Sequence, residues 1–229
     1  MRKIIAAAFV SLDGVMQAPG APEEDPTGGF KFGGWLVPHF DETCGAAVDE
    51  MFARPFNLLL GRKTYDIFAA HWPHFPTDPD AEGYDEGSAA IANRFNATTK
   101  YVASRSQPSL DWQNSRLLGP DVPAALRELK RQDGPDLLTQ GSSVLLQTLL
   151  AEDLIDELRL LTFPLVLGKG KRMLGDGARP AGFRLVDSNV SPSGVIIAAY
   201  ERAGAVETGS FAMEEPTNAE IARRAALGD

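Results

Sequence analysis

The residues best suited to chemistry in this sequence are those that could hold a phosphate group. A strand-like apolar run, Phe56–Leu60, stops at Gly61, and a short polar segment then leads into a helical pattern. Such a turn offers free backbone N–H groups, the positive end of a helix dipole, a hydroxyl and two cationic side chains. The residues expected to contact a phosphate here are Gly61, Arg62, Lys63 and Thr64.

A second turn of the same design lies within residues 136–150, where an apolar strand meets small residues and an apolar helix follows. Small residues let the backbone approach a ligand closely, as a pyrophosphate requires. A plain strand-to-helix connection capped by Ser142 is the alternative interpretation. The residues expected to bind a ligand here are Gln140, Gly141, Ser142, Ser143 and Val144.

Ser104 and Arg105 repeat this arrangement after the predicted strand Lys100–Ala103. A guanidinium group meets two phosphate oxygens at once, which suits the 2′-phosphate of an adenosine. An arginine in an exposed surface turn is the alternative. Together, the three strand ends predict a sheet that holds an elongated anionic ligand at one edge.

A carboxylate, Asp13, follows the unbroken apolar run from Lys3 to Val10, which is typical of a strand covered on both faces. Ligands of α/β proteins bind just outside the carboxyl ends of such strands, so Asp13 is a candidate for substrate chemistry. An Asx turn with Gly14 is the alternative.

The segment Val15–Gly34 is rich in proline and glycine and is predicted to be a long loop. Long ordered loops in compact domains often act as lids. Phe32 within it and Trp35 just after it are candidates for substrate binding, because an aromatic ring could cover a flat substrate. Trp35 could equally pin the loop to the core.

The elements that must position these residues alternate between strands and helices. Helices are expected to begin at the N-caps Asp41 and Asp121. Two closing strands, Phe183–Asn189 and Val195–Glu201, are joined by a Ser-Pro-Ser-Gly hairpin turn. The sequence thus predicts an α/β fold with three layers, in which a mostly parallel central sheet has helices on both faces and a C-terminal antiparallel hairpin.

The composition changes after Ala203, so we expect one domain over residues 1–203 and a tail over residues 204–229. Within the tail, Gly204–Pro216 looks irregular and Asn218–Leu227 has a polar helical pattern. We interpret the tail as a surface element or a subunit-docking element, without chemistry of its own.

Charge and cysteine content exclude several classes of function. The net charge of −9 disfavours nucleic acid and anionic membranes as partners. Cys44 is the only cysteine, which fits a cytoplasmic protein, and the N-terminal apolar run is too short for a signal peptide or a membrane span. His71 and His74 lack a third ligand at a familiar spacing, so no metal site is expected.

The order of these motifs resembles the dihydrofolate reductase-like family, and within it the branch of the reductase (RibD C-terminal) domain of riboflavin biosynthesis proteins and their stand-alone relatives. The resemblance covers roughly the first two hundred residues. The segments that carry it are Ser11–Gly14, Leu60–Tyr65, Ser104–Arg105, Gln140–Ser143 and Pro164–Gly170.

The resemblance implies NADPH as the cofactor and hydride transfer to a small C=N or C=O substrate, such as a pyrimidine or pterin-like compound, and we expect a homodimer. It implies that residues 62–64 contact the phosphates, that residues 141–143 cradle the pyrophosphate, and that Ser104 and Arg105 bind the adenosine side. Asp13 is then expected to bind substrate or supply a proton, with a pKa raised toward neutrality.

Two alternatives remain open for the function. In the first, the protein binds NADPH without catalysis, or serves as a dimeric scaffold of the same fold. In the second, the phosphate sites hold another nucleotide, although Phe56 stands where a Walker A loop needs glycine.

Overall fold

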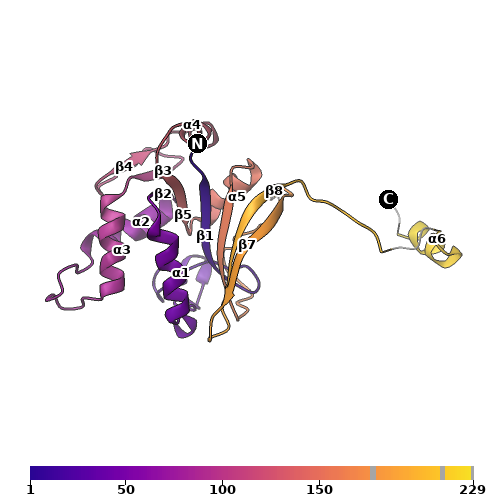
Figure 1. Cartoon of the computed structure of the whole chain (residues 1–229), viewed down its shortest axis with the longest axis horizontal. Helices are drawn as coiled ribbons and strands as arrows, with labels where there is room; N and C mark the ends of the chain where they lie inside the picture. Colours follow the sequence, from indigo (N-terminus) through magenta and orange to yellow (C-terminus); the bar gives the residue numbers. More distant parts are fainter. Residues whose placement is uncertain (176–178, 212–214, 228–229) are drawn as a thin grey trace.

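The computed structural model describes residues 1–175, 179–211 and 215–227. Its centre is an eight-stranded sheet with the strand order β4-β3-β2-β5-β1-β6-β8-β7 (Figure 1). The strands are β1 (Ile4–Ser11), β2 (Phe56–Gly61), β3 (Lys100–Ala103), β4 (Ser115–Leu117), β5 (Asp136–Gln140), β6 (Glu157–Phe163), β7 (Gly182–Val190) and β8 (Ile196–Gly204).

Strands β1 to β6 run parallel, and β7 and β8 form the antiparallel hairpin that the Ser-Pro-Ser-Gly turn predicts. β1 lies between β5 and β6 and is buried along nearly its whole length, because its apolar run is covered on both faces. The predicted α/β sheet with antiparallel closing strands is confirmed.

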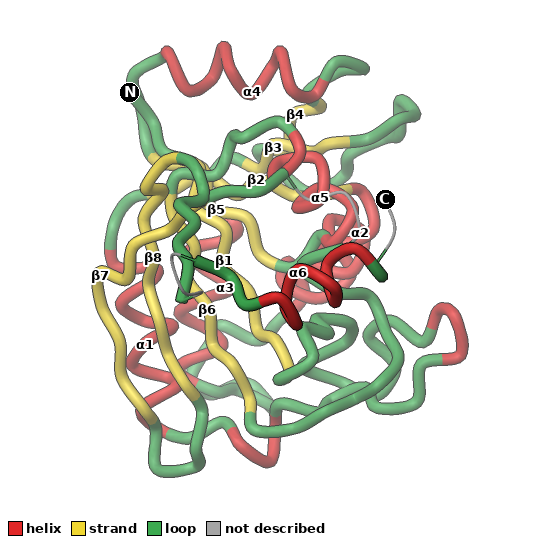
Figure 2. The backbone as a smooth tube through the Cα atoms, turned by 90° about the vertical axis from the view of Figure 1, so that its right-hand side faces the viewer, coloured by secondary structure: helices red, strands yellow, loops and turns green. Residues whose placement is uncertain are grey.

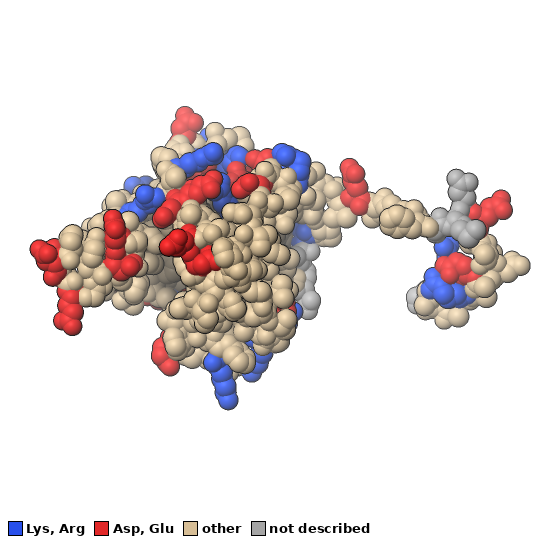
Figure 3. Space-filling model, turned by 60° about the horizontal axis from the view of Figure 1, so that its bottom comes forward, with Lys and Arg blue, Asp and Glu red and all other residues tan. Residues whose placement is uncertain are grey.

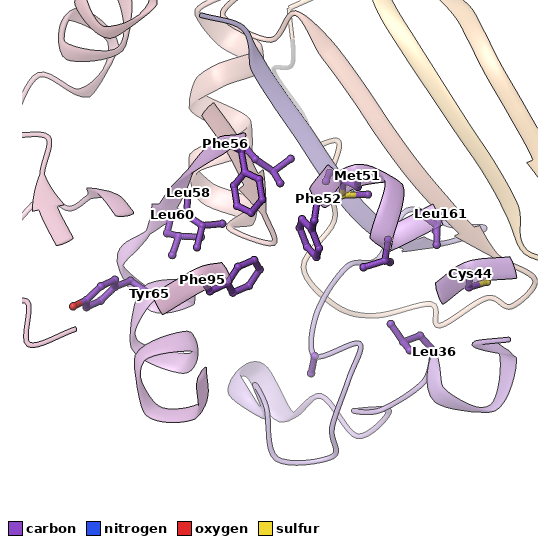
Figure 4. Close-up of a cluster of buried hydrophobic side chains, with 14 of the residues drawn as sticks. Leu36, Cys44, Met51, Phe52, Phe56, Leu58, Leu60, Tyr65, Phe95 and Leu161 are labelled. Atoms are coloured by element: carbon purple, nitrogen blue, oxygen red, sulfur yellow. The ribbon is translucent and has the colours of Figure 1, made fainter. Parts of the chain in front are cut away.

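Helices cover the two faces of this sheet and so create three layers (Figures 1 and 2). One face carries α1 (Glu42–Ala53), α2 (Arg62–His71) and α3 (Glu86–Ala97), and the other carries α4 (Val122–Arg131) and α5 (Ser143–Ala151). Between α1, β2 and α3, the rings of Phe52, Phe56 and Phe95 turn toward one another with centroids 5.3 to 6.2 Å apart (Figure 4). The layers are therefore joined by packed aromatic side chains.

The two predicted N-caps are confirmed. Asp41 accepts a hydrogen bond from the backbone N–H of Cys44 at 3.0 Å, and Asp121 accepts one from Ala124 at 3.0 Å. These contacts fix where α1 and α4 begin, because each carboxylate satisfies a backbone donor that has no partner inside its helix.

The chain beyond β8 leaves the body of the molecule. Residues 205–211 are exposed, and a final helix, α6 (Asn218–Ala225), lies apart from the sheet (Figures 1 and 3). No helix of the described residues has the length and apolar character needed to cross a membrane.

Candidate functional site

A cleft of about 1230 Å³ runs along the carboxyl ends of β3, β2, β5 and β1. All eleven residues predicted to bind the cofactor line it. They are Gly61, Arg62, Lys63, Thr64, Ser104, Arg105, Gln140, Gly141, Ser142, Ser143 and Val144. Parallel strand ends meet at one edge of a sheet, which is why segments far apart in the sequence converge here. Contact of these residues with a cofactor stays a prediction.

The two strand-to-helix turns touch each other across the boundary between β2 and β5. The backbone N–H of Gly61 donates to Ser142 Oγ at 2.9 Å. A Cβ atom on Gly61 would lie 3.4 Å from Ser142 Cβ, and one on Gly141 would lie 3.4 Å from Thr64 Cγ2. A Cβ atom on either glycine would therefore make ordinary van der Waals contact with the other turn, and glycine is favoured at Gly141 by its φ of 63°.

The helices behind these turns differ from the others at their first residues. Among the helices of the described residues, side chains of Asp or Thr cap α1, α3, α4 and α6, whereas α2 and α5 begin without a side-chain cap. Ser142, the N-cap residue of α5, adopts the left-handed conformation, with φ at 62°. The first N–H groups of α2 and α5 are thus left available to an anion in the cleft.

Cationic side chains gather at the same end of the cleft. Lys63 and Arg105 are exposed and make no ion pair within the described part of the chain. The guanidinium of Arg62 is engaged instead by Asp66, through contacts of 2.7 and 2.8 Å from Nε to the two carboxylate oxygens. Lys63 and Arg105 are therefore the cations that are ready to meet a phosphate.

The other end of the cleft is apolar. Its lining includes the β1 residues Ala7, Ala8 and Phe9, together with Leu36 and Met51. β1 continues past the end of β5, whose last residue Gln140 pairs with Ala7, so a flat ring could lie against the β1 backbone at Ala8 and Phe9. This part of the cleft is chemically suited to an uncharged, planar group.

The structure does not bring Asp13 into the cleft. Its Oδ1 accepts hydrogen bonds from Ser11 Oγ at 2.7 Å and from the N–H of Leu167 at 3.0 Å, and its Oδ2 accepts one from the N–H of Gly168 at 2.9 Å. The bond from Ser11, together with the two backbone bonds, lowers the pKa of Asp13 below its ordinary value. The expected rise in this pKa is therefore wrong, because the carboxylate ties two loops together.

Trp35 and Phe32 also lie outside the lining of the cleft, contrary to the expected role in substrate binding. Trp35 is buried, donates from Nε1 to the carbonyl oxygen of Gln17 at 2.8 Å, and packs edge-on against Phe163. Phe32 is exposed and contacts Phe30 edge-on. Trp35 thus pins the loop to the core, which was the alternative reading of its sequence.

The loop that Trp35 pins, which the sequence predicts as a long loop of the kind that often acts as a lid, forms a wall of the cleft. Gln17 donates from Nε2 to the carbonyl oxygens of Asp25 and Thr27, both at 2.9 Å, and accepts from the N–H of Lys171 at 3.0 Å. Lys171 Nζ also pairs with the carboxylate of Asp25. The basic loop after β6 and the acidic loop after β1 are therefore joined beside the cleft.

Glu24 in this wall has a different environment from Asp25. Its Oε2 accepts from the N–H groups of Gly20 at 2.7 Å and Ala21 at 3.3 Å, and no cation pairs with it among the described residues. Burial raises the pKa of Glu24, although the two backbone bonds oppose the rise. Asp25 is also buried, but its bonds from Lys171 and Thr27 prevail and lower its pKa. The sequence signal that could have identified these carboxyl groups was the acidic triplet Glu23-Glu24-Asp25 within the predicted lid.

The histidines at residues 71 and 74 do not form part of a metal centre in the described chain. The ring of His71 packs against Trp72 and Phe75, with centroids 4.8 and 5.6 Å away. No group of three or more His, Cys, Asp or Glu side chains in the described ranges is arranged to hold a metal ion.

The profile of the RibD C-terminal domain matches residues 2–197, which is most of the sequence. The chain belongs to the RibD C-terminal domain family. Within known proteins, this RibD C-terminal domain is 26% identical over 199 residues to the uncharacterized protein YyaP of Bacillus subtilis (strain 168), covering 87% of this chain and 94% of YyaP. It is 24% identical to the uncharacterized protein YwjB of the same organism, covering 74% of this chain and 80% of YwjB.

Solved structures share the fold of this RibD C-terminal domain. A candidate riboflavin biosynthesis protein of Shewanella sp. PV-4 is similar with a TM-score of 0.54 at 21% identity, covering 88% of this chain and 99% of that one. A pyrimidine reductase-like protein of Corynebacterium diphtheriae gives a TM-score of 0.51 at 14% identity, covering 88% and 92%.

A third solved structure is a larger protein that contains the same fold. It is the diaminohydroxyphosphoribosylaminopyrimidine deaminase/5-amino-6-(5-phosphoribosylamino)uracil reductase of Thermotoga maritima, with a TM-score of 0.54 at 17% identity. The match covers 88% of this chain but 57% of that protein. At these identities the likeness establishes the fold.

Proposed function

We propose that this protein is an NADPH-dependent reductase that transfers a hydride to a small C=N or C=O substrate. The observation that carries the proposal is the convergence of three strand ends, two of them with uncapped helix starts, on one elongated cleft. The path from the end of β3 to that of β1 crosses three strand spacings, about 14 Å. That length suits a dinucleotide better than a single phosphate.

The residues at the cationic end fit the phosphates of such a cofactor. The free N–H groups at the starts of α2 and α5, with the hydroxyl of Thr64, would hold the pyrophosphate. Arg105 and Ser104 would bind the adenosine 2′-phosphate, since a guanidinium can engage two of its oxygens. Bound NADPH would supply the hydride from its reduced nicotinamide ring.

The apolar end of the cleft would then hold the flat reacting groups. Ala7 and Ala8 let a planar ring approach β1, while Leu36 and Met51 exclude water from beside it. A pyrimidine or pterin-like compound has the shape for this space, and the family's link to riboflavin biosynthesis favours the same class. A 5-amino-6-(5-phosphoribosylamino)uracil-like substrate is therefore the first to test.

Reduction of a C=N or C=O group also requires a proton, and we assign its supply to Glu24. This carboxyl lines the cleft, whereas Asp13 does not. Backbone donors hold Glu24 Oε2, and among the described residues no hydrogen bond reaches Oε1, which is left to carry the proton. The neighbouring Asp25 stays ionised because Lys171 pairs with it.

The test is a titration with NADPH and NADH by nicotinamide fluorescence, for the natural protein and for Arg105→Ala. We expect Arg105→Ala to weaken NADPH binding by roughly 10- to 100-fold, because a charge-assisted bond to phosphate contributes about 1.5–3 kcal/mol. NADH binding should change by less than about threefold. Arg184→Ala, on the exposed part of β7, is the matched control.

Equal losses for both nucleotides would remove the assignment of Arg105, and absence of binding to either would remove the reductase proposal. With binding established, oxidation of NADPH is followed against pterins, aminopyrimidines and small carbonyl compounds. Binding of NADPH without turnover on any compound of this panel would favour the cofactor-binding protein without catalysis.

A further inference from the structure

We propose that the substrate of this cleft is a flat compound without a phosphate group, either neutral or positively charged, which narrows the substrate class of the proposed function and rests on it. The first compound to test combines a pyrimidine ring with a phosphoribosyl group, and the cleft is suited to the ring rather than to the phosphate. Two features of the cleft beyond its cationic end carry the proposal.

The first feature is the distribution of charged side chains along the cleft. Lys63 and Arg105 follow β2 and β3, at the end assigned to the phosphates of the cofactor. The wall beyond β1 supplies the three carboxyl groups of Glu23–Asp25 and one amine, that of Lys171. The cleft therefore has a cationic end and an acidic wall, and the space left for the substrate lies beside the acidic wall.

Lys171 is not free to meet a phosphate. Its Nζ pairs with the carboxylate of Asp25, and its backbone N–H donates to Gln17 Oε1 at 3.0 Å. A cation that already has a carboxylate partner attracts another anion weakly, because the two opposite charges largely cancel. Glu23 makes no ion pair within the described ranges, so the wall keeps a net negative charge even when Glu24 holds a proton.

The rest of this part of the cleft is largely apolar. Leu36, Met51 and Phe68 contribute to its lining. His71 is its other basic side chain, and the ring of His71 packs edge-on against Trp72, with centroids 4.8 Å apart. A phosphate placed here would lose water and meet apolar side chains or carboxylates, and burial of a charge without a partner is costly.

The second feature is that the backbone donors of a helix start in this part of the cleft are already occupied. Ser88, in the first turn of α3, lines the cleft, but its N–H donates to Asp85 Oδ1 at 2.8 Å. The starts of α2 and α5, at the cationic end, have no side-chain cap. Free backbone donors that suit a phosphate are thus found at the cationic end, whereas at α3 a carboxylate takes their place.

Together these features favour a substrate whose ring lies against β1 and whose remaining part carries no negative charge. Carboxylates attract a positively charged nitrogen heterocycle and repel a phosphorylated one, so the wall discriminates between ligands by their charge.

Inorganic phosphate is the probe for this part of the cleft. The chain is first saturated with NADPH, which fills the cationic end, and the width of the ³¹P NMR line of phosphate then measures binding elsewhere. We expect no measurable binding by the natural chain. Asp25→Asn should gain binding by about tenfold or more, because it frees Lys171. Asp49→Asn, at an exposed position on α1, is the matched control and should gain none.

The outcomes of this titration separate the two proposals. Failure to saturate the chain with NADPH would remove the reductase proposal, and the substrate class with it. Saturation followed by phosphate binding to the natural chain would overturn the substrate class alone. So would the absence of a gain in Asp25→Asn, provided that circular dichroism shows this variant to be folded.

Turnover then compares one ring with and without its phosphate. Oxidation of NADPH is followed with 5-amino-6-(5-phosphoribosylamino)uracil and with the same compound after removal of the phosphate. We expect kcat/KM to be about tenfold or more higher without the phosphate, and Glu23→Gln to narrow the difference. An equal or higher value for the phosphorylated compound would overturn the proposal while leaving the reductase activity in place. If neither compound reacts, the phosphate titration decides.

Discussion

Glu24 and Asp25 are neighbours in the sequence, yet the pKa values of their carboxyl groups shift in opposite directions because their contacts differ. Lys171 neutralises Asp25, whereas Glu24 has backbone donors and no cation in the described structure. A partly buried carboxyl without a cation binds its proton more tightly than one in water. At the scale of single residues, the proposal of Glu24 rather than Asp25 as proton donor therefore rests on one ion pair.

We predict that the Glu24 carboxyl titrates above its ordinary value of 4.5. ¹³C NMR of protein labelled at the glutamate carboxyl carbons measures this, and Glu24→Gln identifies the resonance by removing it. The substitution should leave NADPH affinity within about twofold while lowering turnover about tenfold or more, as loss of a general acid does. A resonance that titrates at or below 4.5 contradicts the assignment, and Glu23→Gln is the matched control.

Lys100 provides a second test at this scale, in the core rather than in the cleft. It is fully buried, donates to the carbonyl oxygens of Phe95 at 2.9 Å and Asn96 at 3.2 Å, and lies 4.3 Å from the ring centroid of Trp112. Burial lowers its pKa from 10.5 to about 8. Between these two values the unfolded chain binds the proton more tightly than the folded one, so stability rises with pH there.

Denaturant unfolding at pH 7.5 and 9.5 measures this effect. From the lowered pKa we expect Lys100 to contribute about 2 kcal/mol more to the free energy of unfolding at the higher pH. The Lys100→Met variant should lose this rise in the free energy of unfolding between the two pH values. The Lys31→Met variant, changed at an exposed position, should keep it. The same pH dependence in both variants would show that another group is responsible.

At the scale of elements, the cleft depends on two turns that hold each other. Gly61 donates to Ser142 Oγ, so the start of α2 and the start of α5 are fixed relative to one another. Ser142, which accepts this bond, adopts a left-handed backbone conformation. That conformation costs a non-glycine residue about 1 kcal/mol or more. Strain of this kind is common where a backbone is arranged for a ligand.

We predict that Ser142→Ala destabilises the protein by about 1–2 kcal/mol, because it leaves the Gly61 N–H without its acceptor. Ser142→Gly loses the same bond but relieves the left-handed strain, so its loss should be smaller. Thermal or denaturant unfolding of the two variants separates the effect of the lost hydrogen bond from that of the backbone strain. Greater destabilisation by Ser142→Gly than by Ser142→Ala would contradict this account.

The strand-and-turn pattern was sufficient to predict the cationic half of the cleft. Gly61–Thr64 and Gln140–Val144 each lie within a short stretch, and parallel strands bring such stretches together by their topology. The wall of the cleft could not be predicted in this way. Asp13 is fixed by Leu167, 154 residues away, and Asp25 by Lys171, 146 residues away, and no local pattern reveals such pairings.

For the whole molecule, the closing hairpin and the tail leave apolar side chains exposed, among them Leu185, Val190 and Phe211. The sequence indicated a change in composition after Ala203 and a helix near the end, and α6 is present at Asn218–Ala225. The division into a domain and a docking tail stays a prediction. If the chain forms the homodimer that the family resemblance implies, its resistance to unfolding will increase with protein concentration, because only the folded chain can pair.

The uncapped starts of α2 and α5 carry a consequence for the protein in a living cell. If these backbone donors bind the proposed dinucleotide, the loaded chain is more stable than the empty one, and by mass action the difference grows with the supply of nucleotide. Proteases degrade chains in proportion to how often they open. Under the proposed function, depletion of the dinucleotide should therefore shorten the lifetime of this protein.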